Sequence, residues 1–232
     1  MLDLHMSKTG VLRKHIAFVV SLHAANALAL WFSYRSDDFP GRDTFIDFFS
    51  LVISEGKVST WFSGATLLAC GLILALIGAA KYRDRDRENV YWLLLSAIFF
   101  YMSFDELTTV HEELGPILGE ALGVTAAALG GWVVPGLIAL AALGVIFARF
   151  VLHLPPRSRV LFVVAGTVYV LGALGMEIVG RAYLAASDDD LTYGIIATVE
   201  EILEMGGIVV FVYALLDYFG THVSPRVSIT LS

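Results

Sequence analysis

The sequence predicts an all-α, polytopic integral membrane protein: a six-transmembrane-helix bundle with one interfacial amphipathic helix between helices 1 and 2. Hydrophobic residues make up 57% of the 232 residues and charged residues only 16%, against roughly 25% charged residues in soluble domains. The mean hydropathy is +0.76. We therefore expect a single transmembrane helical domain over residues 1–232, with the lipid bilayer as its main partner.

Six apolar stretches are each long enough to cross a bilayer as a helix. Crossing ~30 Å of hydrocarbon takes about 20 residues at 1.5 Å per residue. The stretches that reach this length are residues 12–34, 60–82, 90–112, 132–152, 160–184 and 191–219. Gly115 and Pro116 follow the third stretch and are expected to end or kink its helix.

Residues 40–56, between the first two spans, are too short and too charged to cross the membrane. The segment begins at Pro40, a favourable early helix position, and mixes acids with large apolar side chains. This pattern is typical of an amphipathic helix on the outer membrane interface. Two roles remain open for it: a connector resting on lipid headgroups, or a lid over a site that faces outward.

The distribution of basic residues predicts the orientation, because Lys and Arg gather at cytoplasmic ends. With the N-terminus inside, eleven of the 15 Lys and Arg residues fall in inner segments. The N- and C-termini are then both cytoplasmic. A bacterial-type inner (plasma) membrane is the expected location.

Ionisable side chains lie within three of the predicted spans, where they are costly and usually functional. The third span carries one cluster, the sixth a second, and the fifth a single acid. These candidate site residues are Asp105, Glu106, His111, Glu112, Glu177, Glu200, Glu201 and Glu204. Possible accessory residues are His23 and Asn26 on the first span and Arg181 on the fifth.

Depth and facing indicate that the acids share one pocket. At 1.5 Å per residue, Asp105 lies about 22 Å and Glu177 about 25 Å above the cytoplasmic side. Glu200 and Glu204 lie roughly 14 to 20 Å below the outer surface. At about 100° per residue, Asp105 shares a helix face with Glu112, and Glu200 stacks above Glu204. We expect a three-helix acidic pocket that opens outward.

The fifth span has its own predicted face. Gly166, Ala173, Glu177 and Gly180 form a line of mostly small residues, and small residues let helices approach closely. Arg181, four residues after Glu177, is expected to form an intrahelical ion pair with it. One arginine cannot balance all the acids, so bound cations or protonated carboxyls must offset the remaining charge.

The donor types narrow the chemistry. Many carboxylates, one or two imidazoles and no thiolate favour a divalent metal ion, namely Fe, Mn, Ca or Mg, with Zn also open and Cu(I) not expected. The first hypothesis is thus a membrane metalloprotein, whose status as an enzyme stays open. The second is a proton- or cation-translocating transporter or channel that uses the same acids. The third is a structural membrane subunit whose acids join helices.

Several other classes are not expected. Among the histidines only His23 lies deep, which argues against haem, and the sixth span has no lysine for a retinal Schiff base. No Walker loop or Gly-x-Gly-x-x-Gly is present, so no nucleotide is expected. Nucleic acid is not an expected partner either. A small ion or a lipid-soluble substrate fits the pocket, and a homo-oligomer remains open.

Overall fold

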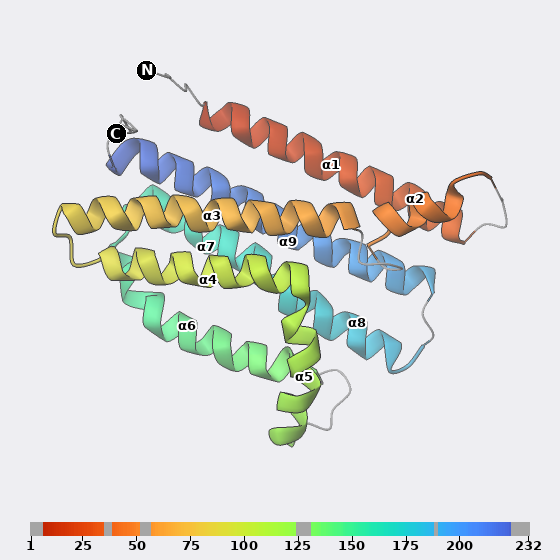
Figure 1. Cartoon of the computed structure of the whole chain (residues 1–232). Coiled ribbons are helices and arrows are strands. Elements are labelled where there is room, and N and C mark those ends of the chain that lie inside the picture. Colours follow the sequence, from red (N-terminus) through yellow and green to blue (C-terminus); the bar gives the residue numbers. More distant parts are fainter. Residues whose placement is uncertain (1–6, 35–38, 52–56, 124–130, 188–189, 224–232) are drawn as a thin grey trace.

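The computed structural model of the chain describes residues 7–34, 39–51, 57–123, 131–187 and 190–223. All regular structure within these ranges is helical, which confirms the predicted all-α class. The long helices lie side by side, whereas α5 crosses one end of the bundle (Figure 1). The elements are α1 (Lys8–Ser33), α2 (Arg42–Phe49), α3 (Lys57–Arg83), α4 (Asn89–Thr108), α5 (Val110–Ala121), α6 (Val133–His153), α7 (Pro156–Val170), the π-helical segment η2 (Leu171–Met176), α8 (Glu177–Leu184) and α9 (Leu191–His222).

Five of the described helical stretches are long and apolar enough to cross a membrane. They are α1, α3, α4, α6 and the run of α7, η2 and α8 from Pro156 to Leu184. These five correspond to the first five predicted spans. The sixth predicted span, residues 191–219, forms α9, which is not one of the five. α9 packs at the centre of the bundle, against α1, α3, α7, η2 and α8.

The core of the bundle is aromatic where α9 meets α4, α6 and α7. Trp92 is fully buried, and its ring centroid lies 4.5 Å from that of Tyr218 and 5.1 Å from that of Phe150. Phe211 stacks on Phe99 at 4.7 Å. Lipid tails are as apolar as these side chains, so close packing, rather than transfer out of water, holds membrane helices together. This contact fixes the position of α9.

Small residues bring α3 and α4 together. A Cβ added to Gly64 would lie 3.0 Å from the Leu107 side chain, so a larger residue there would require Leu107 to shift. Two serine hydroxyls on α4 donate to backbone carbonyls of α3 in buried hydrogen bonds: Ser103 to Gly64 at 2.7 Å and Ser96 to Gly71 at 2.8 Å. Such interhelical hydrogen bonds add to packing in lipid. They set the rotation of α4 and, with it, the direction of its acids.

The segment predicted as an interfacial helix over residues 40–56 is helical at Arg42–Phe49, while residues 52–56 lie outside the described residues. The helix α2 packs against α1 and α3. Arg42 donates to the carbonyl of Phe32 at 2.8 Å, and Ile46 is buried. Its location at a membrane surface stays a prediction.

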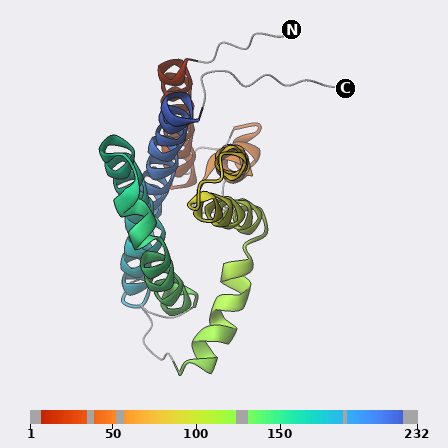
Figure 2. The same cartoon turned by 90° about the vertical axis from the view of Figure 1, so that its left-hand side faces the viewer.

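The third predicted span ends earlier than expected. α4 stops at Thr108, Thr109 adopts a left-handed conformation with φ of 51°, and α5 begins at Val110 in a new direction. The expected break at Gly115 and Pro116 was wrong, because Pro116 lies inside α5. The helix α5 then runs from α4 toward α6 (Figure 2).

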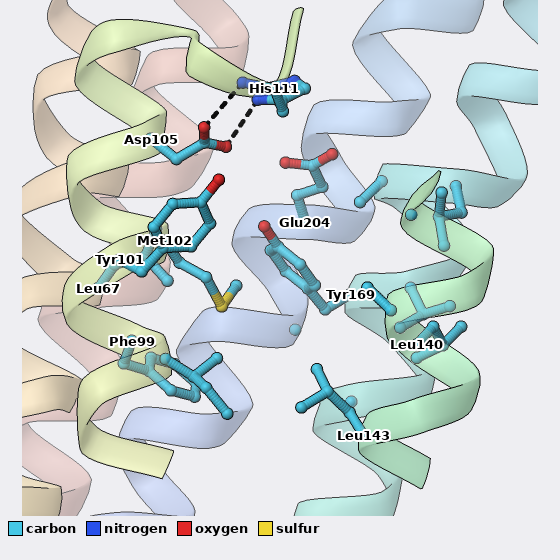
Figure 3. Close-up of a pocket in the computed structure, with 18 of the residues that line it drawn as sticks. Leu67, Phe99, Tyr101, Met102, Asp105, His111, Leu140, Leu143, Tyr169 and Glu204 are labelled. Carbon is cyan, nitrogen blue, oxygen red and sulfur yellow. Dashed lines mark hydrogen bonds and ion pairs between the residues drawn. The ribbon is translucent and has the colours of Figure 1, made fainter. Parts of the chain in front are cut away.

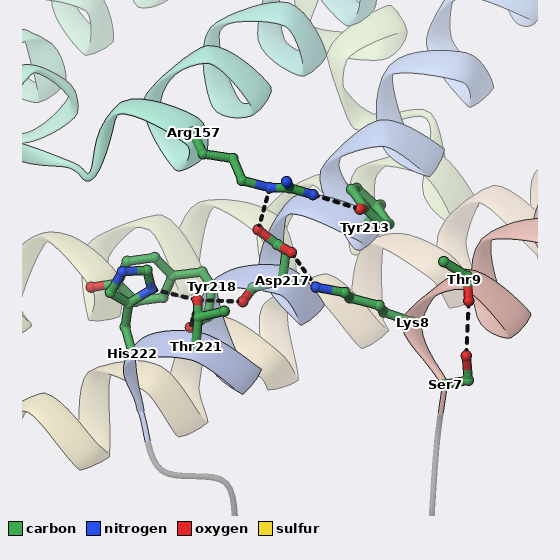
Figure 4. A network of polar contacts seen from close by, with 9 residues as sticks. All are labelled: Ser7, Lys8, Thr9, Arg157, Tyr213, Asp217, Tyr218, Thr221 and His222. Atoms are coloured by element: carbon green, nitrogen blue, oxygen red, sulfur yellow. Dashed lines mark hydrogen bonds and ion pairs between the residues drawn. The ribbon is translucent and has the colours of Figure 1, made fainter.

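At the opposite end of the bundle, one buried carboxylate joins three helices (Figure 4). The side chain of Asp217 on α9 is 5% exposed and accepts from Lys8 at the start of α1. Its second oxygen accepts from Arg157 Nε at the start of α7, at 3.0 Å. Arg157 also donates to the Tyr213 hydroxyl at 2.9 Å. We call these four residues the ion clamp.

Candidate functional site

The first part of the candidate site lies at the junction of α4 and α5. Asp105 Oδ1 accepts from the backbone N–H of His111 at 2.9 Å, and its Oδ2 lies 2.6 Å from His111 Nδ1. Asp105 thus caps the start of α5, where a negative charge is favourable, and it orients the imidazole. The indole of Trp132 meets the His111 ring edge-on at 4.9 Å. The other ring nitrogen, His111 Nε2, lies 3.9 Å from Glu112 Oε1.

The second part of the site lies where α9 touches α7 and η2. A Cβ on Gly172 would lie 2.8 Å from Glu204 Cγ, and one on Gly207 would lie 2.7 Å from the backbone nitrogen of Tyr169. Two glycines therefore allow the helices to touch. The contact places Glu204 and Tyr169 side by side, both directed toward the Asp105–His111 pair (Figure 3). π-Helical segments such as η2 occur often at functional sites.

Between these two parts lies a cavity of about 610 Å³, well within the range of small-molecule sites. Its wall is formed by α4 and α5 on one side, by α6 and α7 on the other, and by α9. Most of the lining side chains are apolar. The polar side chains in the lining are at one end: Tyr101, Asp105, Glu106, His111, Tyr169 and Glu204. We call these six residues the polar end of the cavity.

The other predicted acids lie near this cavity but are not part of its lining. Glu177 accepts from Arg181 Nε at 2.5 Å, so the expected intrahelical pair is confirmed. Glu200 lies within electrostatic range of Glu177, Glu201, Arg181 and Glu112. These residues form a second group, which includes the site's arginine. The single predicted pocket is therefore divided into a cavity-facing group and an arginine-bound group.

The break at Thr109 explains the position of Glu112. The prediction that Glu112 shares a face with Asp105 was wrong, because it assumed one continuous helix. Glu112 is 54% exposed and its Oε1 lies 3.9 Å from His111 Nε2. It therefore sits at the rim of the site.

The predicted metal ligands do not converge on one point. Within the described residues, no three His, Cys, Asp or Glu side chains form a group that could hold a metal ion. Two contacts give a physical reason: both Asp105 oxygens face donors of His111, and Glu177 faces Arg181. The expected Fe, Mn, Zn or Ca ion stays a prediction without geometric support.

The two accessory residues on α1 lie away from the cavity. Asn26 is buried and joins three elements: it donates to Thr198 Oγ1 at 2.9 Å and accepts from the Leu51 backbone at 3.0 Å. Its contacts are those of a structural residue. The ring nitrogens of His23 are buried and have no hydrogen-bond partner among the described residues. Neither side chain belongs to the lining of the cavity.

Sequence reasoning missed Tyr101, Tyr169 and Trp132. Tyr169 lies in the apolar stretch 160–184, eight residues before Glu177. A phenol at membrane depth needs a polar neighbour, so this tyrosine was the available signal. The cavity itself had no signal in the sequence, since its wall consists mostly of ordinary apolar residues from the five helices named above, from η2 and, at Leu67, from α3.

The fold defines a class: an all-helical protein with several long apolar helices, compatible with a membrane protein. The chain belongs to the family described as a domain of unknown function (DUF8692), whose model matches residues 16–219. The match begins within α1, ends within α9 and includes all the candidate site residues. No curated protein and no solved structure matches the chain.

Proposed function

We propose that this protein is a proton-coupled cation carrier of a bacterial-type inner membrane, with Glu204 as the carboxyl that exchanges a proton for a cation. α9 serves as the sixth span, so that both termini are cytoplasmic and the polar end of the cavity lies in the outer half of the membrane. The helix α2 then rests at the outer surface.

The environment of Glu204 carries this proposal. The charged groups that act most strongly on Glu204 are Glu201, Glu106, Glu200 and Glu177, all of them acids. Ionised carboxylates so close together at membrane depth repel one another and are costly to bury. A proton or a bound cation removes this cost. The same carboxyl can therefore hold either one, which is the minimum requirement for exchange.

The shape of the cavity supports carriage rather than simple binding. Its lining extends from His111 and Trp132 at the polar end of the cavity to Phe150 and Val151 near the C-terminal end of α6. A cargo released from Glu204 thus has a path along the bundle. A structural subunit would need no such path.

Exchange is tested with purified protein in liposomes that are acidic inside and carry an internal pH dye. Sodium, potassium, calcium, manganese or the organic cation decyltrimethylammonium is added outside. Wild-type protein should raise the internal pH with at least one cation, and Glu204→Gln should reduce this rate about tenfold or more, since it removes the exchanging proton. The matched control is Glu120→Gln, an exposed acid of α5 outside the cavity lining, which should leave the rate unchanged.

Two results would overturn the carrier. The first is no pH change with any of the five cations. The second is stoichiometric metal in purified wild-type protein that is lost in both Glu204→Gln and Asp105→Asn, which would make the acids metal ligands.

A further inference from the structure

The cavity is long and narrow in proportion to its volume. Along α6 its lining runs from Pro135 to Val151, a separation of sixteen residues or about 24 Å at 1.5 Å per residue. This is most of the ~30 Å depth of a hydrocarbon core. A volume of about 610 Å³ spread over that length fits a slender molecule rather than a compact one.

Polarity is divided sharply along this length. Beyond Tyr169 and Glu204 the labelled lining side chains are Leu67, Phe99, Met102, Leu140 and Leu143, all apolar (Figure 3). The polar end carries three acids, one histidine and two tyrosines, and the described lining includes no lysine or arginine. A complementary ligand has an apolar tail and a head that tolerates or prefers negative surroundings.

Two polar groups at this end lack a protein partner. In the described part of the chain, neither the Glu204 carboxyl nor the Tyr169 hydroxyl makes a hydrogen bond, although both side chains are partly buried and face the cavity. Buried polar groups normally have partners. A ligand head group in the cavity would supply partners for both, and Tyr169 also offers an aromatic face to a cation.

Parts of the cavity wall are exposed on the surface of the helix bundle. Two of its lining residues, Tyr101 on α4 and Val163 on α7, are 54% and 51% exposed on the bundle. A ligand dissolved in the bilayer can therefore enter from the side, without passing through water.

We propose that the cavity binds a single-chain amphiphile with a positively charged amine head, taken up from the bilayer. The tail lies along α6 and the head lies between Glu204 and the Asp105–His111 pair. This inference rests on the proposed function for the role of Glu204 as the counter-ion of the cargo. A carboxylate or phosphate head would face Asp105, Glu106 and Glu204, with no lysine or arginine in the described lining to balance its charge.

Binding is measured with the protein in nanodiscs of zwitterionic phospholipid, using tritiated dodecylamine, with the signal of empty nanodiscs subtracted. Dodecanoate carries the same tail with the opposite charge, and ethylamine carries the head without the tail. We expect saturable binding of dodecylamine and at least about tenfold weaker binding of each of the other two.

Two pairs of variants separate head from tail. Glu204→Gln should weaken dodecylamine binding about tenfold or more, while Glu204→Asp keeps the charge and should retain part of it. Leu143→Trp fills the apolar part of the cavity and should weaken binding, whereas Val145→Trp, at a position 81% exposed and outside the lining, should not. Elution as a single species in size-exclusion chromatography shows that each variant is folded.

Equal binding of dodecylamine and dodecanoate would overturn the inference, since the cavity would then hold any lipid tail. Binding of ethylamine as strong as that of dodecylamine would also overturn the inference, since the tail would then contribute nothing to binding. Flux of an inorganic cation without saturable dodecylamine binding overturns this inference alone and leaves the carrier. Dodecylamine binding that depends on Glu204, without proton exchange for any cation, overturns only the carrier.

Discussion

Two carboxylates on the same helix, Glu204 and Asp217, have opposite surroundings. Asp217 accepts from Lys8 and Arg157 in the ion clamp, and its charge is balanced. Glu204, thirteen residues earlier on α9, lies beside acids and faces a cavity. Burial alone therefore does not distinguish a functional acid from a structural one. The charges that surround each acid do, and the following predictions test that distinction, from the largest expected effect to the smallest.

The close approach of α9 to α7 at the polar end should be the most sensitive feature. In Gly207→Ala the new Cβ would lie 2.7 Å from the backbone nitrogen of Tyr169 and 2.9 Å from the carbonyl of Ala165. Backbone atoms cannot rotate away, so we expect a loss of about 3 kcal/mol in stability, measured as a lower thermal unfolding temperature in detergent. Gly206→Ala is the control, because its Cβ would meet only Val168 at 4.0 Å. Equal losses in both variants would contradict the close approach.

Removing the negative charge of the ion clamp should destabilise the protein at the end of the bundle opposite the candidate site. Asp217→Asn leaves Lys8 and Arg157 without their shared carboxylate. Both cations are partly exposed and regain water, so the expected loss is roughly 1–2 kcal/mol rather than the larger cost of a fully buried pair. Thermal unfolding in detergent measures it. An unchanged unfolding temperature would mean that the clamp adds nothing to stability.

The equivalent change at the polar end should have the opposite sign. Glu204→Gln removes a charge from among acids, and we expect stability to stay equal or to rise by up to about 1 kcal/mol. The same unfolding measurement applies. A loss as large as that of Asp217→Asn would show that Glu204 is a structural residue, and the contrast between the two acids would fail.

The smallest effect concerns Asp86, in the loop between α3 and α4. It accepts from the backbone N–H of Glu88 and from Lys81, both at 2.9 Å, and these hydrogen bonds hold the pKa of the Asp86 carboxyl below its usual range. Because the pKa of Asp86 is lower in the folded chain than in the unfolded chain, its carboxylate stabilises the fold at pH values above the pKa of the unfolded state. This contribution is lost as the pH falls through the pKa of the folded state. The free energy of unfolding of the wild-type protein should therefore exceed that of Asp86→Asn by less than about 1 kcal/mol at neutral pH.

A pH series of unfolding temperatures checks this prediction. The difference between wild type and Asp86→Asn should be constant above about pH 5 and should shrink toward zero below the ordinary aspartate pKa of about 3.9. A difference that grows as the pH falls has the wrong sign.

The sequence predicted the apolar helices, the position of the acids in three of them and the pair between Glu177 and Arg181. Each follows from local rules of length, depth and helical spacing. No such rule predicts the break between α4 and α5 at Thr109, because threonine rarely adopts the left-handed conformation and no glycine, the residue usually found in it, is adjacent. As a result, the helix face predicted for Glu112 from a constant 100° per residue was wrong.

The predicted line of Gly166, Ala173, Glu177 and Gly180 failed for a related reason. Gly166 and Ala173 line the cavity, whereas Glu177 pairs with Arg181 and Gly180 faces Tyr193 of α9. The π-helical segment η2 lies between α7 and α8, and each π-helical turn takes in an extra residue. The phase of the helix therefore shifts before Glu177, which a constant 100° per residue cannot anticipate.

The ion clamp has a consequence for how the protein is made. Lys8 and Asp217 are 209 positions apart in the sequence, so nearly the whole chain leaves the ribosome before they can meet. α1 must enter the membrane while Lys8 still lacks its carboxylate. The clamp closes only when the end of α9 arrives, so its formation is a late step of biogenesis, and chains that end before Asp217 cannot form it.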